Sequence, residues 1–175
     1  EISNSFNRDL EIMIRFTPGI ECHTHEYIRT GSFDSKFGFG IEYLDILFNK
    51  INKTKHLKLK GLHAHIGSQI FELDPHKDLG EIMINVILEA RKFGHDIQKL
   101  NVGGGLGIKY TENDDPPSID EWVKTISNSV VEACKKNNLD FPKLMCEPGR
   151  SVVSTAGITI YKIGAFKEIP GIRTY

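Results

Sequence analysis

The stretch Asn101-Val-Gly-Gly-Gly-Leu-Gly-Ile-Lys-Tyr110 organises this sequence, and four of its ten residues are glycine. Residues 97–102 are typical of a short strand, and this strand runs straight into the glycines. Three consecutive glycines allow successive backbone N–H groups to turn towards one point, so a phosphate group can approach the main chain. A flexible turn is the alternative interpretation. A dinucleotide-binding fingerprint is a poor match, because Tyr110 stands where its third glycine should be.

Strand and helix patterns alternate on both sides of this stretch. The predicted strands are residues 10–16, 57–66, 97–102 and 143–146, with a fifth at 157–166; the predicted helices are residues 41–51, 81–93 and a segment that begins at the Ser118-Ile-Asp-Glu121 capping box. Such alternation is typical of parallel βαβ units. Four units are about half of an eight-stranded α/β barrel, which needs about 250 residues, whereas this chain has 175.

Composition excludes some classes of partner. The 22 basic and 23 acidic residues are mixed along the chain and leave a net charge of -1, and no apolar run reaches membrane-spanning length. We therefore expect neither nucleic acid nor membrane as a partner. Three widely spaced cysteines suit reduced thiols in a cytoplasmic protein better than a disulfide framework. The chain starts at Glu1 and ends after a strand-like segment, so both ends look cut.

Polar side chains follow the carboxyl ends of the predicted strands, where ligand sites of α/β folds lie. His63 and His65 share one face of the second strand, a spacing that suits zinc. No further His or Asp closes the other strand ends, so no metal is predicted. Three other histidines are expected at the surface: His56, His76 and His95.

An imidazole, a glycine-rich anion cradle, a carboxylate and an arginine thus follow successive strands. This set suits a phosphorylated, cationic aromatic cofactor, and pyridoxal 5'-phosphate fits it. The glycines would take the phosphate, His65 would cover a ring face, and Glu147 would keep the pyridine nitrogen protonated so that the ring can act as an electron sink. Ser68 could offer a hydroxyl to the phosphate, and Arg150 could pair with a carboxylate or phosphate.

Three motifs closely resemble the barrel motifs of the diaminopimelate decarboxylases, an alanine-racemase-like, fold type III family of pyridoxal phosphate enzymes. They are Gly61-Leu-His-Ala-His-Ile-Gly-Ser-Gln-Ile70, Asn101 to Tyr110, and Cys146-Glu-Pro-Gly-Arg-Ser-Val-Val153. A loop that looks specific to this family adds His23-Thr-His-Glu-Tyr-Ile28, Thr30-Gly31 and Asp34-Ser-Lys-Phe-Gly38. The resemblance covers nearly the whole chain, with the motifs in order.

The resemblance implies the later half of a (β/α)8 TIM-like barrel at residues 1–155, and the start of a β-rich C-terminal domain at residues 156–175. It implies decarboxylation of meso-2,6-diaminopimelate to L-lysine by a full-length homodimer. By the same resemblance, His65 and Glu147 would be catalytic, and Arg150 would bind the substrate carboxylate. The implied cofactor-binding residues are His65, Ser68, Gly103, Gly104, Gly105, Glu147, Pro148, Gly149 and Arg150.

One departure from the family is serious. The motif that carries the cofactor-linking lysine, similar to Tyr-Ala-Val-Lys-Ala-Asn, is absent, as are the family's acid/base cysteine and its second domain. The chain as given is therefore not expected to turn over substrate alone. Three alternatives stay open: an ornithine- or arginine-type decarboxylase of the same family, a zinc-dependent barrel hydrolase that uses His63 and His65, and a non-catalytic pyridoxal phosphate carrier.

Overall fold

The structure, a computed structural model, describes residues 2–20, 36–171 and 173–174, so most of the loop motif between His23 and Gly38 lies outside the described residues. A five-stranded sheet with the order β2-β1-β3-β4-β5 forms the centre, and every neighbouring pair is parallel. The strands are β1 Leu10–Thr17, β2 Phe39–Gly40, β3 Leu57–His63, β4 Lys99–Asn101 and β5 Lys143–Met145. The four predicted strands before residue 150 are thus confirmed; β1 ends one residue later than predicted, and the other three are shorter.

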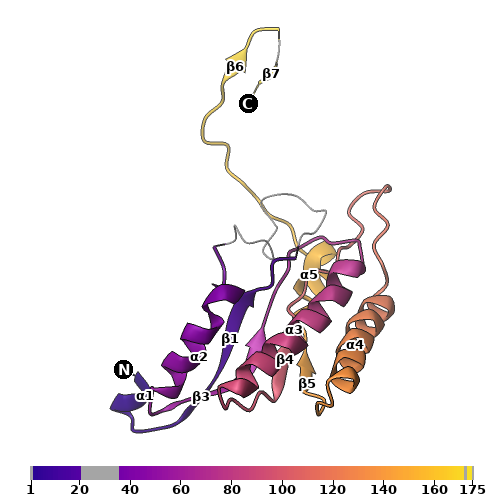
Figure 1. The fold of residues 1–175 in the computed structure, drawn as a ribbon. Coiled ribbons are helices and arrows are strands. Elements are labelled where there is room, and N and C mark those ends of the chain that lie inside the picture. Colours follow the sequence, from indigo (N-terminus) through magenta and orange to yellow (C-terminus); the bar gives the residue numbers. More distant parts are fainter. Residues whose placement is uncertain (1, 21–35, 172, 175) are drawn as a thin grey trace.

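The helices are α1 Ile2–Ser5, α2 Leu44–Asn52, α3 Asp74–Lys92, α4 Ile119–Lys136 and α5 Gly149–Val153, with 3-10 turns η2 Ile41–Tyr43 and η3 Ser154–Ala156. Strands β1, β3, β4 and β5 lie side by side in sequence order. Right-handed crossovers therefore place α2, α3 and α4 on one side of the sheet, as Figure 1 shows. This is the winding of an α/β barrel, not of a doubly wound sheet, whose strand order reverses. The α/β fold class is confirmed.

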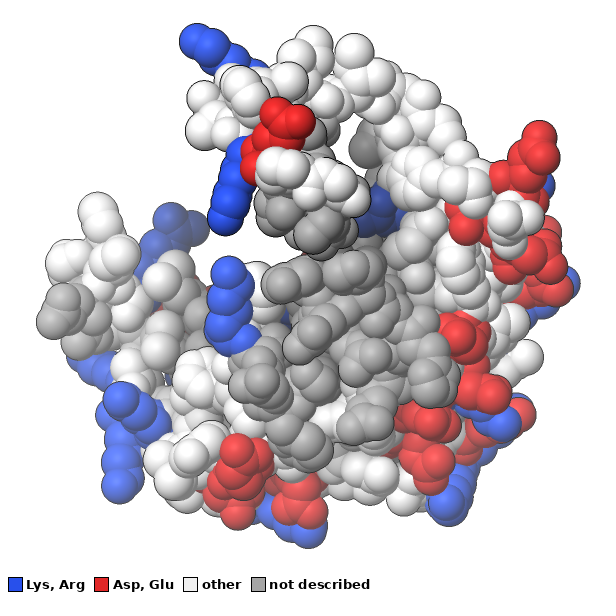
Figure 2. Space-filling view, turned by 90° about the horizontal axis from the view of Figure 1, so that it is seen from above, with Lys and Arg blue, Asp and Glu red and all other residues white. Residues whose placement is uncertain are grey.

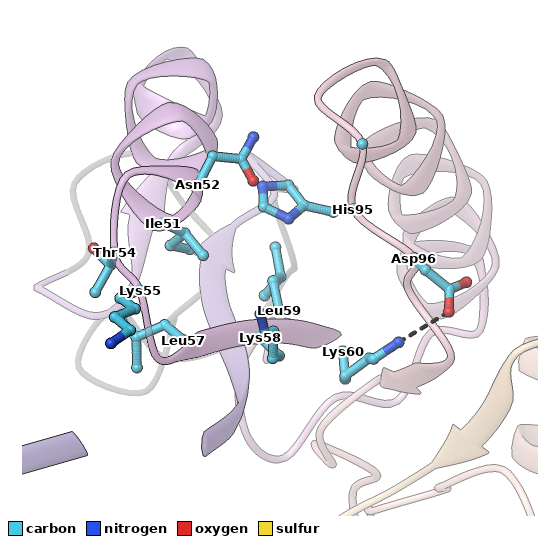
Figure 3. A pocket seen from close by; sticks show the side chains of 11 residues that line it. Ile51, Asn52, Thr54, Lys55, Leu57, Lys58, Leu59, Lys60, His95 and Asp96 are labelled. Carbon is cyan, nitrogen blue, oxygen red and sulfur yellow. Dashed lines mark hydrogen bonds and ion pairs between the residues drawn. The ribbon is translucent and has the colours of Figure 1, made fainter. Parts of the chain in front are cut away.

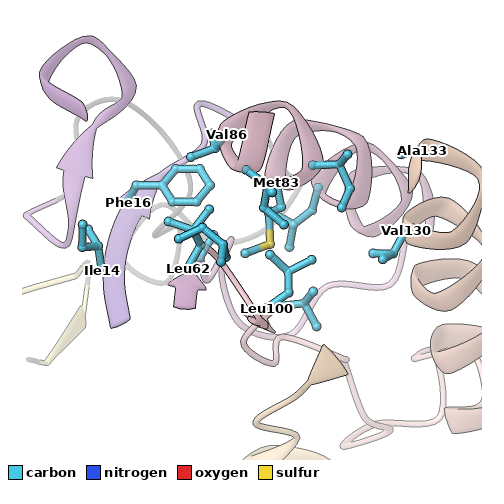
Figure 4. Packing of buried hydrophobic residues seen from close by; sticks show 14 of the residues in the cluster. Ile14, Phe16, Leu62, Met83, Val86, Leu100, Val130 and Ala133 are labelled. Atoms are coloured by element: carbon cyan, nitrogen blue, oxygen red, sulfur yellow. The ribbon is translucent and has the colours of Figure 1, made fainter. Parts of the chain in front are cut away.

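The core lies between the sheet and these helices (Figure 4). Phe16, Leu62 and Leu100 extend from the strands and are at most 1% exposed. They pack with residues of α3 and α4, of which Met83 is fully buried. Each such side chain contributes roughly 1.5–3 kcal/mol by leaving water. The opposite face of the sheet corresponds to the interior of a barrel, and it carries the polar residues described below.

The capping box that predicts α4 is formed in full. Ser118 Oγ accepts from the Glu121 N–H, and Glu121 Oε2 accepts from the Ser118 N–H. Helix α3 begins at Asp74, seven residues before the predicted start, with Pro75 in its first turn. The prediction missed the start of α3 because one of the residues that this part of the helix buries is His76. In the sequence His76 stands among charged residues and gives no apolar signal.

The prediction that His56, His76 and His95 lie at the surface is wrong, because they are 8%, 0% and 8% exposed. His56 Nδ1 lies 2.9 Å from Asp9 Oδ1, and His95 Nε2 lies 3.1 Å from the Phe48 carbonyl oxygen. One nitrogen of each ring thus has a hydrogen-bond partner, so burying these two imidazoles costs little free energy. His76 instead packs edge-on against a tryptophan of α4.

The predicted strand at residues 157–166 is also wrong. No strand is assigned there, and its large apolar side chains are between 77% and 88% exposed: Ile158, Ile160, Tyr161, Ile163 and Phe166. An alternating pattern forms a strand only when another strand pairs with it, and the described chain places none beside it. The segment extends away from the sheet and leads to a short antiparallel pair, β6 Glu168–Ile169 and β7 Arg173–Thr174 (Figure 1).

None of the described helices combines the length and the apolar character that crossing a bilayer requires.

Candidate functional site

A row of polar side chains crosses the sheet near the carboxyl ends of its strands. Arg15 of β1 pairs in register with His63 of β3, and His63 pairs with Asn101 of β4. Residues in register on neighbouring strands point to the same face. The row therefore lies on the face of the sheet opposite the helices, and it places a cation, an imidazole and an amide beside each other.

The glycine loop directly follows this row, and its glycines are needed for close packing. Gly103 has a φ of +68°, and a Cβ there would lie 2.7 Å from the Ala64 carbonyl oxygen. A Cβ on Gly104 would collide with the Glu147 carbonyl oxygen. The amides of these two glycines donate to Asn101 Oδ1 at 2.9 Å and to His65 Nδ1 at 3.1 Å. Close packing thus explains why glycine is needed at these two positions without any bound phosphate. Their contacts with a phosphate stay a prediction.

Glu147 is brought to the same place by β5. Its N–H donates to the Gly103 carbonyl oxygen at 2.7 Å, and its Oε1 accepts from Asn101 Nδ2 at 2.8 Å. Its other carboxylate oxygen, Oε2, lies 3.7 Å from His63 Nε2. The Gly149 N–H turns back to the Glu147 carbonyl oxygen at 2.8 Å, so Pro148 and Gly149 form a tight turn into α5. The predicted residues His65, Gly103, Gly104 and Glu147 therefore meet.

Ser68 and Arg150 form the neighbouring part of the site. Arg150 Nε and Nη2 donate to Ser68 Oγ at 3.0 and 2.8 Å, and Nη1 donates to Tyr110 Oη at 2.7 Å. The Arg150 guanidinium also lies over the Tyr110 ring, 5.7 Å from its centre. Gly105 borders this group, because a Cβ there would lie 2.7 Å from the carbonyl oxygen of Gly67, the residue before Ser68. A cation, a hydroxyl and a glycine amide at one place suit a phosphate group.

Burial determines the charge state of the site. It lowers the pKa of His63 and of His65, and the positive charge of Arg15 lowers both further. Burial also lowers the pKa of Arg15, while Glu147 opposes that change. Both imidazoles are therefore neutral at neutral pH. Arg15 also lies 4.8 Å from the centre of the Phe37 ring.

The structure gives no support to the zinc alternative, and its other polar pocket lies away from the site. Within the ranges described, His, Cys, Asp and Glu side chains nowhere gather in groups of three that could hold a metal ion. A polar pocket of about 310 Å³ lies near the amino end of β3, at the edge of the sheet opposite the site (Figure 3). Lys55, Lys58 and Lys60 line this pocket, and Lys60 pairs with Asp96 at 3.0 Å.

Seen from the carboxyl ends of the strands, the surface carries both signs of charge (Figure 2). Basic side chains stand singly on the left and in the centre, and acidic ones gather on the right. A continuous basic stripe is what nucleic-acid binding requires, and the part of this face that the structure describes shows none.

The sequence analysis missed three residues of the site: Arg15, Asn101 and Tyr110. Arg15 and Asn101 are polar residues that lie directly beside the buried residues Phe16 and Leu100 on their strands, and a charged or amide group next to buried strand residues is a signal that could have identified them. Tyr110 gives no such signal, because only the fold of the loop after β4 brings it to Arg150.

Known proteins resemble this chain over most of its length. Residues 2–154 match the family described as pyridoxal-dependent decarboxylase, pyridoxal binding domain. The chain is 54% identical over 166 residues to diaminopimelate decarboxylase of Synechocystis sp., covering 95% of this chain and 35% of that protein. It is 42% identical over 171 residues to the Staphylococcus aureus enzyme of the same name, covering 97% and 40%.

A solved structure extends the similarity to the fold. The crystal structure of diaminopimelate decarboxylase from Helicobacter pylori, complexed with L-lysine, superimposes with a TM-score of 0.76 at 31% identity, covering 87% of this chain and 36% of that one. The chain thus spans well under half of the length of the relatives it matches. Because the family match extends over most of its residues, the chain belongs to the pyridoxal-dependent decarboxylases, in the region of their pyridoxal binding domain.

Proposed function

We propose that this chain is part of a longer enzyme that uses pyridoxal 5'-phosphate to decarboxylate meso-2,6-diaminopimelate to L-lysine. The relatives that carry the name diaminopimelate decarboxylase support this, at 54% and 42% identity. The Helicobacter pylori relative was crystallised with L-lysine, the product of this reaction. The observation that carries the proposal is the meeting of His65, the glycine loop and Glu147 at one edge of the sheet.

The residues present fit the cofactor. Ser68 Oγ and the Arg150 guanidinium lie within 3.0 Å of each other beside Gly105, whose close approach to Gly67 leaves no space for a Cβ. Among the described residues, the Gly105 N–H donates to no backbone carbonyl oxygen. These groups would bind the phosphate. His65 would lie against the ring, and Glu147 would face its pyridine nitrogen.

When bound, the cofactor supplies an electron-accepting ring that stabilises the negative charge left at Cα when carbon dioxide departs. The residues of this chain prepare that ring. Glu147 holds a proton at the pyridine nitrogen, and His65 presents an uncharged face because burial lowers its pKa. Arg150 holds the phosphate together with Ser68, and it has the guanidinium needed to pair with a substrate carboxylate.

The same proposal covers the division of the chain into domains and the assembly of the complete enzyme. Residues 1–155 belong to the later half of the barrel, and residues 156–175 lead into a β-rich C-terminal domain. The exposed apolar side chains between Ile158 and Phe166 support this, since a further domain would cover them. The complete enzyme is proposed to be a cytoplasmic homodimer.

Borohydride reduction of the complete protein, followed by mapping of the modified lysine, tests the cofactor assignment. We expect a pyridoxyl group on a lysine outside these 175 residues, and a shifted spectrum of the bound cofactor in Glu147→Ala. A complete protein that binds no pyridoxal phosphate, or that requires zinc, would overturn the proposal.

The substrate is tested separately, by carbon dioxide release from meso-2,6-diaminopimelate, ornithine and arginine. We expect release from meso-2,6-diaminopimelate alone. A preference for ornithine or arginine would retain the cofactor assignment and favour the alternative decarboxylase.

A further inference from the structure

The Asn101 side chain joins the glycine loop to Glu147. Its Nδ2 donates to Glu147 Oε1 at 2.8 Å, and its Oδ1 accepts from the Gly103 N–H at 2.9 Å. One bond needs a donor and the other an acceptor, so a single orientation of the amide satisfies both. The contact to Gly103 spans two residues and is a local turn, whereas the contact to Glu147 connects β4 with the segment after β5.

Asn101 is itself held firmly. It is 7% exposed, and it pairs in register with His63 on one side and Met145 on the other. Its carbonyl oxygen accepts from the Ala64 N–H at 3.0 Å. Glu147, in contrast, has 53% of its side chain exposed. A half-exposed glutamate samples several rotamers unless a neighbour restrains it, and Asn101 provides that restraint from a rigid strand.

The restraint also selects the oxygen that is left for a ligand. Asn101 takes Oε1 of Glu147, while Oε2 lies on the side of His63, 3.7 Å from its Nε2. His63 Nε2 is buried and has no hydrogen-bond partner among the described residues. The carboxylate is therefore oriented by its hydrogen bond to Asn101, and Oε2 stays free of a hydrogen bond from His63.

We propose that Asn101 is a positioning residue for the cofactor. It fixes the Glu147 carboxylate relative to the Gly103 peptide, so the group that faces the pyridine nitrogen and the loop that faces the phosphate behave as one unit. This inference rests on the proposed pyridoxal phosphate site. Asn101 acts through Glu147 and does not itself need to touch the ring.

Two substitutions separate the two hydrogen bonds of Asn101. In Asn101→Ser the hydroxyl still accepts from the N–H two residues on, as serine does in turns, but it is too short to reach Glu147. Asn101→Ala loses both bonds. Asn137→Ala is the matched control, because Asn137 Nδ2 donates at 2.8 Å to the Ala133 carbonyl oxygen at the end of α4, away from the site.

The measurements use the complete protein, stripped of cofactor and titrated with pyridoxal phosphate. They are the dissociation constant, the absorbance maximum of the bound cofactor and the melting temperature. We expect Asn101→Ser to weaken binding about tenfold, the effect of one hydrogen bond to a charged group, and to shift the absorbance while the melting temperature stays near that of the parent. Asn137→Ala should change only the melting temperature.

A double-mutant cycle with Glu147→Ala decides whether Asn101 acts through Glu147. We expect Asn101→Ser to have almost no further effect on binding or absorbance once Glu147 is alanine. Additive effects, or an Asn101→Ser protein with the affinity and spectrum of the parent, would overturn the inference. A parent protein that binds no pyridoxal phosphate would instead overturn the proposed function, so the two failures are distinguishable.

Discussion

Lowering the pH should destabilise this fold through His76, and His76→Phe should remove most of that effect. His76 is fully buried, and neither of its ring nitrogens has a hydrogen-bond partner among the described residues. Burial, with a smaller contribution from His65, lowers the pKa of His76 from 6.5 to about 4. The folded protein therefore keeps His76 neutral at pH values where the unfolded chain already binds a proton.

The sign and size of the effect follow from this difference in proton binding. Above pH 6.5 neither state binds the proton, so His76 leaves the stability unchanged. As the pH falls from 6.5 to about 4, the unfolded state gains protons that the folded state cannot accept, and the free energy of unfolding decreases. The two pKa values differ by about 2.5, so at about 1.4 kcal/mol per pH unit the full loss is about 3.5 kcal/mol, of which about 3 kcal/mol is reached at pH 4, where the folded state is itself half protonated.

Urea unfolding of the parent and of His76→Phe between neutral pH and about pH 4 measures this loss. Phenylalanine keeps a flat ring edge-on to Trp122, whose ring centre lies 5.7 Å from that of His76. His63 and His65, whose pKa values burial also lowers, are present in both proteins. The difference between the two pH profiles therefore reports His76 alone. We expect it to grow by about 3 kcal/mol, and parallel profiles would refute the reasoning.

Three further predictions concern the glycine loop, Arg150 of α5 and the cap of α4. Gly104→Ala should abolish cofactor binding and lower the melting temperature, because its Cβ would meet the Glu147 carbonyl oxygen; normal binding in a titration would contradict this. Arg150→Lys should weaken pyridoxal phosphate binding about tenfold, because lysine cannot reproduce the forked contact with Ser68; an unchanged dissociation constant would exclude this role. Ser118→Ala should cost about 1 kcal/mol in urea unfolding without changing cofactor affinity, since it removes the cap of α4.

Much of the secondary structure could be predicted because its signals are local. The apolar run from Leu10 onward, the capping box at Ser118 and Gly94 after α3 each encode an element within a few residues. The predicted strand at residues 157–166 failed for the opposite reason, since a strand depends on a partner that its own sequence does not supply.

The candidate site was predictable in part. His65, the glycines and Glu147 could be identified because each lies at or just after the carboxyl end of a predicted strand, and parallel strands end at one edge. Their contacts could not be predicted, because Asn101 reaches Glu147 only through the register of β4 with β5. Arg15 enters the site in the same way, through its register with His63.

The sequence by itself determined the alternation of strands and helices, the α/β class and the kind of chemistry that the strand ends carry, because periodicity and residue type are local properties. Only the tertiary structure decided that two of the three consecutive glycine amides are bonded within the protein, that Arg150 is held by Ser68 and Tyr110, and that His76 is buried. These features depend on strand register and helix packing, which bring together residues far apart in the chain and have no signature in any single segment.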